Sequence, residues 1–209
     1  MIWQPIHKIW LSVVVMLVLL SSMTSGATLL VTAVTLSGAV FVVCAAQQHR
    51  LAPFFGSLMA AVYGYLAYRQ GYYGDMLINW AYHLPMYLMA IAVWSRSTFH
   101  PKTLAKGELK LLLWLSVGLF MLLSTGLEWA GGSHPSIDAA STVAAFIGTL
   151  LLSRGYREQW YFWTIGNALG VTLWLLASLR DPSQTPVLVM WIVFFFNGLW
   201  GLYLWHKKQ

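Results

Sequence analysis

The chain has 209 residues, a net charge of +6 and a charged fraction of only 9%, whereas 59% of its residues are hydrophobic. A soluble domain carries roughly 25% charged residues, so this composition excludes a protein whose whole surface faces water. Most of the chain must lie in lipid. The basic residues occupy short loops between apolar segments, which argues against nucleic acid as a partner. Cys44 is the single cysteine, which excludes an internal disulfide and a cysteine-based zinc site.

Eight apolar segments follow one another along the chain. A hydrocarbon core about 30 Å thick is crossed by a helix of roughly 20 apolar residues, and each segment has about that length. Turn residues or charges bound every segment, such as Ser25-Gly26 before the second and Arg180-Asp181-Pro182 before the eighth. The segments cover residues 9–24, 27–46, 52–69, 74–95, 109–129, 137–154, 160–179 and 186–205.

The first segment allows two interpretations. Lys8, a short apolar run and the small residues Ser25, Gly26 and Ala27 resemble a signal peptide. The same residues fit a retained helix, which we favour. Either interpretation leaves the seven later helices in the same orientation.

The charges follow the predicted crossings. With the N-terminus in the cytoplasm, ten of the 12 basic residues fall inside, and only Arg69 and Arg180 fall outside. The inside residues are Lys8, Arg50, Arg96, Lys102, Lys106, Lys110, Arg154, Arg157, Lys207 and Lys208. Four of the six acids fall outside, and these are Asp75, Glu128, Asp138 and Asp181. The pattern predicts a multi-pass protein of the inner or plasma membrane with a cytoplasmic C-terminus.

Segments two to four and six to eight share features that suggest an internal repeat. The first helix of each triplet ends in a short basic loop, the second begins with aromatic residues, and the third ends at a tryptophan, Trp94 or Trp205. We therefore expect an all-α integral membrane protein with a seven-helix 3+1+3 parallel-repeat core and one extra N-terminal helix. In such transporters the solute binds between the repeats near the midplane. The expected parts are an N-terminal helix (1–26), a first repeat (27–95), a linker helix region (96–136) and a second repeat (137–209).

The seventh segment carries the pattern W-x-x-W-x-x-x-N. Trp160, Trp163 and Asn167 are spaced by three and four residues, so they share one face of a helix. An indole wall beside an amide suits a flat heteroaromatic ring with hydrogen-bonding groups. Tryptophans at a helix end also anchor membrane proteins at the lipid headgroups, and Asn167 and Asn197 could instead bond neighbouring helices.

Two other function classes compete with transport. An intramembrane enzyme needs a convergent set of nucleophile, base or metal ligands, whereas His83, Asp138 and Ser141 lie on two segments without a recognised spacing. We therefore expect no enzyme, no cofactor and no metal, and interpret His83 as a packing residue rather than a proton relay. A membrane sensor or scaffold would lack a polar-lined cavity between the repeats.

Several co-linear residues resemble the PnuC-type vitamin transporters, over roughly residues 36–95 and 137–205. The resemblance rests on Tyr68, Gly71 and Tyr73, on the stretch from Asn79 to Trp94 with Leu84-Pro85-Met86, and on Asp138, Trp160, Trp163, Asn167, Asn197-Gly198 and Trp205. The resemblance implies a full-length relative of the SWEET sugar transporters that works as a facilitator. It further implies trapping of the solute by a cytoplasmic kinase, and a homotrimer.

Carried over from this resemblance, Trp160, Trp163 and Asn167 would line the pocket, with Asn197 on the facing repeat and Asp138 near the outer mouth. This sequence also departs from the family, since Tyr87 stands where an amide is common, Ala60 where asparagine is common and Thr149 where glutamine is common. Tyr87, Thr149 and His83 complete the expected substrate-binding set.

The expected function is facilitated uptake of a nucleoside-like solute, most simply nicotinamide riboside. A deoxynucleoside or a thiamine-like vitamin carried by the same fold is the alternative.

Overall fold

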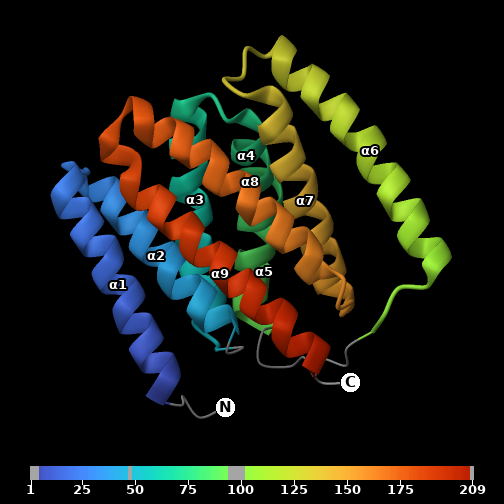
Figure 1. Ribbon diagram of the computed structural model, residues 1–209, viewed down its shortest axis with the longest axis horizontal. Coiled ribbons are helices and arrows are strands. Elements are labelled where there is room, and N and C mark those ends of the chain that lie inside the picture. The colour runs from blue at the N-terminus through green and yellow to red at the C-terminus, as the bar shows by residue number, and fades with distance from the viewer. Residues whose placement is uncertain (1–4, 47–48, 94–101, 208–209) are drawn as a thin grey trace.

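The computed structural model describes residues 5–46, 49–93 and 102–207, which form a bundle of long helices (Figure 1). α4, η1 and α5 follow one another without a break, so the described chain contains eight long helical rods that match the eight predicted segments to within a few residues. Trp94, Arg96 and Lys208 lie outside the described residues. The elements are α1 (Pro5–Ser25), α2 (Leu29–Ala46), α3 (Ala52–Gln70), α4 (Tyr73–Leu77), η1 (Ile78–His83), α5 (Leu84–Val93), α6 (Lys106–Trp129), α7 (Pro135–Arg154), α8 (Gln159–Arg180), η3 (Pro182–Gln184) and α9 (Thr185–Lys207).

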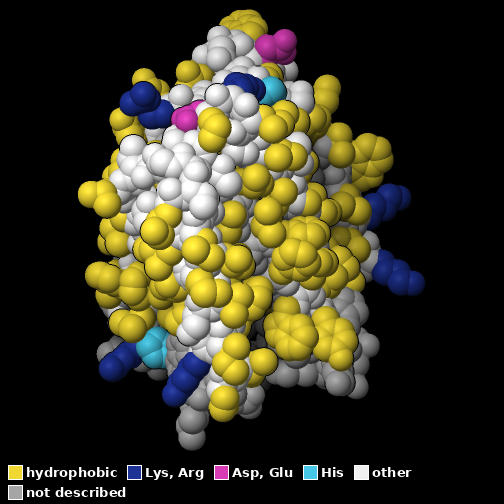
Figure 2. All heavy atoms as spheres, turned by 60° about the vertical axis from the view of Figure 1, so that its left-hand side comes forward, with side chains coloured by type: hydrophobic (Ala, Val, Ile, Leu, Met, Phe, Trp, Pro, Cys, Tyr) yellow, Lys and Arg dark blue, Asp and Glu magenta, His cyan; other side chains and the backbone are white. Residues whose placement is uncertain are grey.

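The surface of the bundle suits a bilayer. Among the described residues, six helices are long and apolar enough to cross a membrane, namely α1, α2, α6, α7, α8 and the helix that continues from η3 into α9. α3 has comparable length but carries three tyrosines and Arg69, which make it less apolar. Hydrophobic side chains cover the middle of the face seen in Figure 2, and charged side chains gather toward its edges.

The loops divide between the two ends of the bundle. The first residues of α1 and the last of α9 lie at the same end in Figure 1, together with the α2–α3 and α7–α8 connections. We call this the basic end, because Arg50, Lys102 and Arg157 belong to its loops and Arg154 is the last residue of α7. Two hydrogen bonds join loops there, from Lys102 N–H to Gly155 C=O (2.8 Å) and from Arg157 N–H to Lys102 C=O (2.9 Å). The opposite, acidic end holds Glu128 and Asp181.

The helices pack in a reciprocal order. α2 packs on α3 and on α9, while α4 packs on α3 and on α7, so the first helix of each triplet meets the third rod of the other. The two remaining helices cover the outside, α1 against α2 and α9, and α6 against α7 and α4. Val14 and Val18 of α1 are fully buried next to Ala39 and Val193, so α1 is an integral part of the packed bundle.

α3 and α7 end in the same way. Gly71 after α3 and Gly155 after α7 both have positive φ, +72° and +79°, in the left-handed region that glycine adopts at low cost. The following tyrosines close the turn, with Tyr72 N–H donating to Ala67 C=O and Tyr156 N–H to Leu151 C=O, each at 2.9 Å. The chain can therefore reverse within two or three residues and start the next helix.

One turn of the fourth rod is a π-helix, η1. The N–H of Leu84 donates to the C=O of Asn79, five residues earlier. Pro85 follows directly, and a proline has no N–H and clashes with the carbonyl four residues before it. A wider turn relieves that clash, and π-turns in α-helices often mark functional sites. Here the turn carries Asn79 and His83, both buried.

Asp138 ties the two triplets together at the acidic end. Its carboxylate is fully buried and accepts hydrogen bonds from the backbone N–H groups of Gly74 (2.7 Å) and Asp75 (2.8 Å) in the first turn of α4. An anion at a helix N-terminus is favourable because the N–H groups there lack helical partners. Gly74 makes the approach possible, since a Cβ at that position would lie 2.8 Å from the Asp138 carboxylate.

We expect Asp138→Ala to lower the stability of the folded protein by about 2 kcal/mol, because two buried N–H groups lose their acceptor. Thermal unfolding of the purified protein in detergent measures the change. Asp181→Ala is the matched control, since that carboxylate also accepts from a backbone N–H but is exposed, so water replaces the lost bond. Equal unfolding temperatures for Asp138→Ala and the unmodified protein would contradict the assigned role.

Candidate functional site

A cavity of about 570 Å³ lies between the two triplets. Residues of α2, α3 and the α4–α5 rod line one side, and residues of α7, α8 and α9 line the other, whereas the lining includes no residue of α1 or α6. Small-molecule sites typically measure 300–1,000 Å³. The cavity therefore has room for a molecule the size of a nucleoside.

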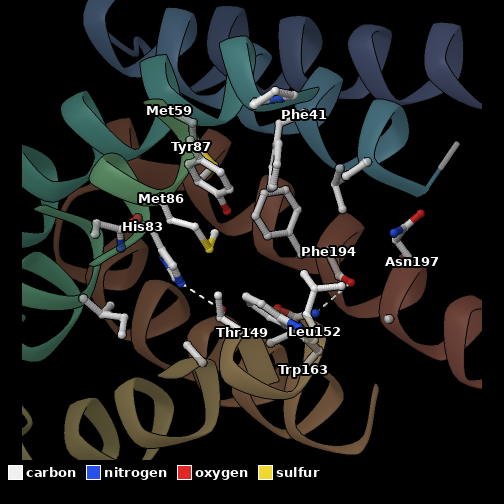
Figure 3. Close-up of a pocket in the computed structure, with 18 of the residues that line it drawn as sticks. Phe41, Met59, His83, Met86, Tyr87, Thr149, Leu152, Trp163, Phe194 and Asn197 are labelled. Carbon is white, nitrogen blue, oxygen red and sulfur yellow. Dashed lines mark hydrogen bonds between the residues drawn. The ribbon is translucent and has the colours of Figure 1, made fainter. Parts of the chain in front are cut away.

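Aromatic rings form a row along the cavity. The His83 ring stacks between Trp163 (centroids 6.1 Å apart, 26° between planes) and Tyr87 (5.9 Å, 28°), and Phe41 packs on Tyr87 at 5.0 Å. The Tyr87 hydroxyl points toward the same space as the Met86 sulfur (Figure 3). These faces come from both triplets, so a flat ring in the cavity would contact both halves of the bundle.

Two packing details hold the row in place. His83 Nε2 lies 3.2 Å from the Thr149 hydroxyl, which joins η1 to α7 across the cavity (Figure 3). Gly148 leaves room for Trp163, since a Cβ at position 148 would lie 3.1 Å from the indole Nε1. The ring positions thus depend on the neighbouring residues Gly148 and Thr149 of α7.

Amide side chains supply polar contacts in the same cavity. Asn167 donates to the C=O of Phe194 at 2.9 Å, which joins α8 to α9, and Asn79 donates to the C=O of Asp75 at 2.8 Å. Asn197 of α9 is half-buried and also lines the cavity. The amide nitrogen of Asn167 bonds the neighbouring helix α9 while the side chain also lines the cavity. Helix bonding and a place in the binding site are therefore compatible roles for Asn167.

The cavity is closed toward the acidic end by a buried network centred on Tyr63. The Tyr63 hydroxyl donates to Asp75 Oδ2 (2.5 Å) and accepts from the indole N–H groups of Trp174 (2.7 Å) and Trp191 (3.2 Å). A second tyrosine, Tyr72, donates to the C=O of Leu173 at 2.7 Å. Each of these tyrosines connects the first triplet to the second.

The cavity is open toward the basic end. The lining residues Ala46, Arg50, Leu152 and Ser153 are solvent-exposed there, whereas Tyr63 at the other end is 1% exposed. Because the side chains at one end are exposed and those at the other are hydrogen-bonded and buried, the described structure gives access to the cavity from one side only.

The structure brings seven of the eight expected site residues to this cavity. They are Trp160, Trp163, Asn167, Asn197, Tyr87, Thr149 and His83. Asp138 does not line the cavity, because its carboxylate is used at the N-terminus of α4.

Several lining residues were missed by the sequence analysis. Tyr63, Asn79 and Gln159 are polar and line the cavity, and Asp75, counted only as an outside acid, is 2% exposed beside Tyr63. Gln159 lies four residues before Trp163, and this spacing was the signal that could have found it, because residues spaced by four share a helix face. Nothing in the sequence marks Tyr63, whose partners lie on three other helices. Within the described residues, no group of three or more His, Cys, Asp or Glu side chains could hold a metal ion.

The comparisons with known proteins agree with this architecture. Residues 28–207 match the family model described as nicotinamide mononucleotide transporter. The nicotinamide riboside transporter PnuC of Haemophilus influenzae is 25% identical over 215 residues, which cover 98% of this chain and 91% of that protein. The PnuC protein of Neisseria mucosa is 27% identical over 164 residues, 73% of this chain and 62% of that relative's length. The crystal structure of the vitamin B3 transporter PnuC has the same fold, with a TM-score of 0.83 at 22% identity over 98% of this chain and 92% of the other.

A helical membrane bundle around a cavity lined by aromatic and amide side chains fits a transporter of small molecules, the class to which the matched family and relatives belong. The match over residues 28–207 identifies the particular kind: the chain belongs to the nicotinamide mononucleotide transporter family. The predicted relationship to the PnuC-type transporters is thereby confirmed.

Proposed function

We propose that this protein is a uniporter that takes up nicotinamide riboside or a closely related nucleoside. The observation that carries the proposal is the cavity between the triplets, in which stacked rings and amides line a space of about 570 Å³. Any nucleobase-like ring can stack on an aromatic side chain, and each stacked ring contributes about 1–3 kcal/mol. The names of the relatives supply the nicotinamide riboside part of the proposal.

Alternating access by two parallel repeats is the proposed mechanism. The reciprocal packing, α2 on α9 and α4 on α7, supports two equivalent triplets that rock about the cavity. With the basic end assigned to the cytoplasm by the positive-inside rule, the described state is open to the inside. The bonds of Asp138, Tyr63 and Tyr72 between the triplets must then break when the outside opens. Phosphorylation of the solute by a cytoplasmic kinase would make uptake one-way.

A homotrimer, expected from the resemblance, is also a proposal. The outward faces of α1 and α6 carry large exposed hydrophobic side chains, including Trp114 and Leu122, and such faces fit lipid or further copies of the chain.

Proteoliposomes containing the purified protein test the function directly. We expect labelled nicotinamide riboside to enter until its inside and outside concentrations are equal, at a rate unaffected by a sodium or proton gradient. Liposomes without protein are the control. Accumulation above the outside concentration would contradict uniport, and uptake of thymidine or thiamine in place of nicotinamide riboside would favour the alternative solutes.

Trp163→Ala should weaken solute binding by roughly 5- to 140-fold, because a stacked ring contributes about 1–3 kcal/mol and 1.4 kcal/mol corresponds to a factor of ten. Asn167→Ala should also weaken binding. Calorimetric titration of the purified variants measures both effects. Trp114→Ala is the matched control, since that indole is 67% exposed on α6, away from the cavity. Unchanged affinity in both cavity variants would remove this site assignment.

The alternative solutes are favoured by the buried phenol of Tyr87, at a position where the resemblance to the PnuC-type transporters implies an amide. Tyr87→Gln should raise the affinity for nicotinamide riboside relative to thymidine, because it restores the amide that the resemblance to nicotinamide riboside transporters implies at this position. Competition binding with the two nucleosides measures the ratio. Tyr82→Gln is the control, because Tyr82 is on the same helical rod but outside the cavity lining, and it should leave the affinity ratio unchanged. An unchanged ratio in Tyr87→Gln would mean that position 87 does not set selectivity.

A further inference from the structure

Gln159 is a buried glutamine at the open half of the cavity. It is the first residue of α8, it is 1% exposed, and it lines the cavity. Its side-chain Nε2 is buried, and no acceptor among the described residues receives a hydrogen bond from it. The preceding residue is held firmly, since Glu158 Oε1 accepts from the N–H of Leu104 at 3.0 Å.

The other buried amides of the cavity differ in this respect. Asn79 and Asn167 both donate to backbone carbonyls, at 2.8 and 2.9 Å. A buried donor without an acceptor destabilises the folded state, and such groups are rare in native proteins unless they serve a function. The donor of Gln159 thus resembles a group that is completed by a ligand.

The position of Gln159 relative to the ring-binding residues indicates which part of a ligand it would meet. Gln159, Trp163 and Asn167 are spaced by four residues and lie along one face of α8. At 1.5 Å per residue, Gln159 lies about 6 Å from Trp163 along the helix axis, on the side away from Asn167. A sugar attached to a ring that stacks on Trp163 can extend over this distance toward the open end.

We infer that Gln159 donates a hydrogen bond to a sugar hydroxyl oxygen of the solute and so favours nucleosides over their free bases. This inference rests on the proposed function and assigns an orientation within it. The ring contacts Trp163 in the middle of the cavity, its polar substituent faces Asn167, and the sugar points to the basic end.

Gln159→Met tests the inference, because methionine has a similar size and no donor. Calorimetric titration compares a nucleoside with its own base, nicotinamide riboside with nicotinamide and thymidine with thymine, using whichever pair binds the unmodified protein. We expect the affinity for the nucleoside to fall about tenfold, the factor that corresponds to one hydrogen bond of ordinary strength, while the affinity for the base stays the same. Gln159→Leu, which also lacks a donor and an acceptor, should give the same selective loss.

Gln184→Met is the matched control. Gln184 is also a buried glutamine, 9% exposed, but it lies at the acidic end outside the cavity, so neither affinity should change. An equal loss for nucleoside and base in both Gln159 variants would overturn the inference, because a structural role affects both ligands. Unchanged affinities would also overturn it. If the unmodified protein binds neither pair, the proposed function itself fails, which is a distinct result.

Discussion

The fold depends on two sets of buried hydrogen bonds between the triplets, both at the acidic end of the bundle. Asp138 accepts from the first turn of α4, and Tyr63 joins Asp75 to the indoles of Trp174 and Trp191. In a low-dielectric interior an unpaired polar group is costly, so these groups hold the acidic end shut. Far fewer such bonds are needed at the basic end, where Arg50 and Ser153 reach solvent. The cavity between the two ends is accordingly bounded by buried, hydrogen-bonded residues at the acidic end and by exposed residues at the basic end.

The site is built on rigid helices, and a local irregularity positions part of it. The π-turn before Pro85 carries Asn79 and His83, and the ring of His83 stacks between rings from both triplets. Gly148 of α7 leaves room for Trp163 in this stack, and Gly74 of α4 leaves room for the Asp138 carboxylate at the acidic end. A motion that separates the triplets would change the ring stack and the bonds at the acidic end together, which links the contents of the cavity to its access.

Much of the fold was predictable because a bilayer imposes simple rules on length and charge. The segment bounds, and the basic residues Arg50, Arg154 and Arg157 at or between segment ends, follow from apolar runs and basic interruptions. The spacing of Trp160, Trp163 and Asn167 follows from helical periodicity. Asp138 was expected at the outer mouth, yet it is used as a helix cap, and the capped residues lie more than 60 positions away in the chain. Tyr63 and the unpaired donor of Gln159 were missed for a similar reason: their importance comes from neighbours on other helices, which periodicity within one segment does not report.

The places of α1 and α6 bear on the ancestry of the chain. Each lies against the first helix of its own triplet and the third rod of the other, so each triplet together with its outer helix can be taken as a half of four helices. A four-helix half crosses the membrane an even number of times, and a copy fused behind it is inserted in the same direction without a further connecting helix. Two separate half-length chains would likewise face the same way and could pair as a dimer, from which duplication and fusion of one gene would yield the present arrangement.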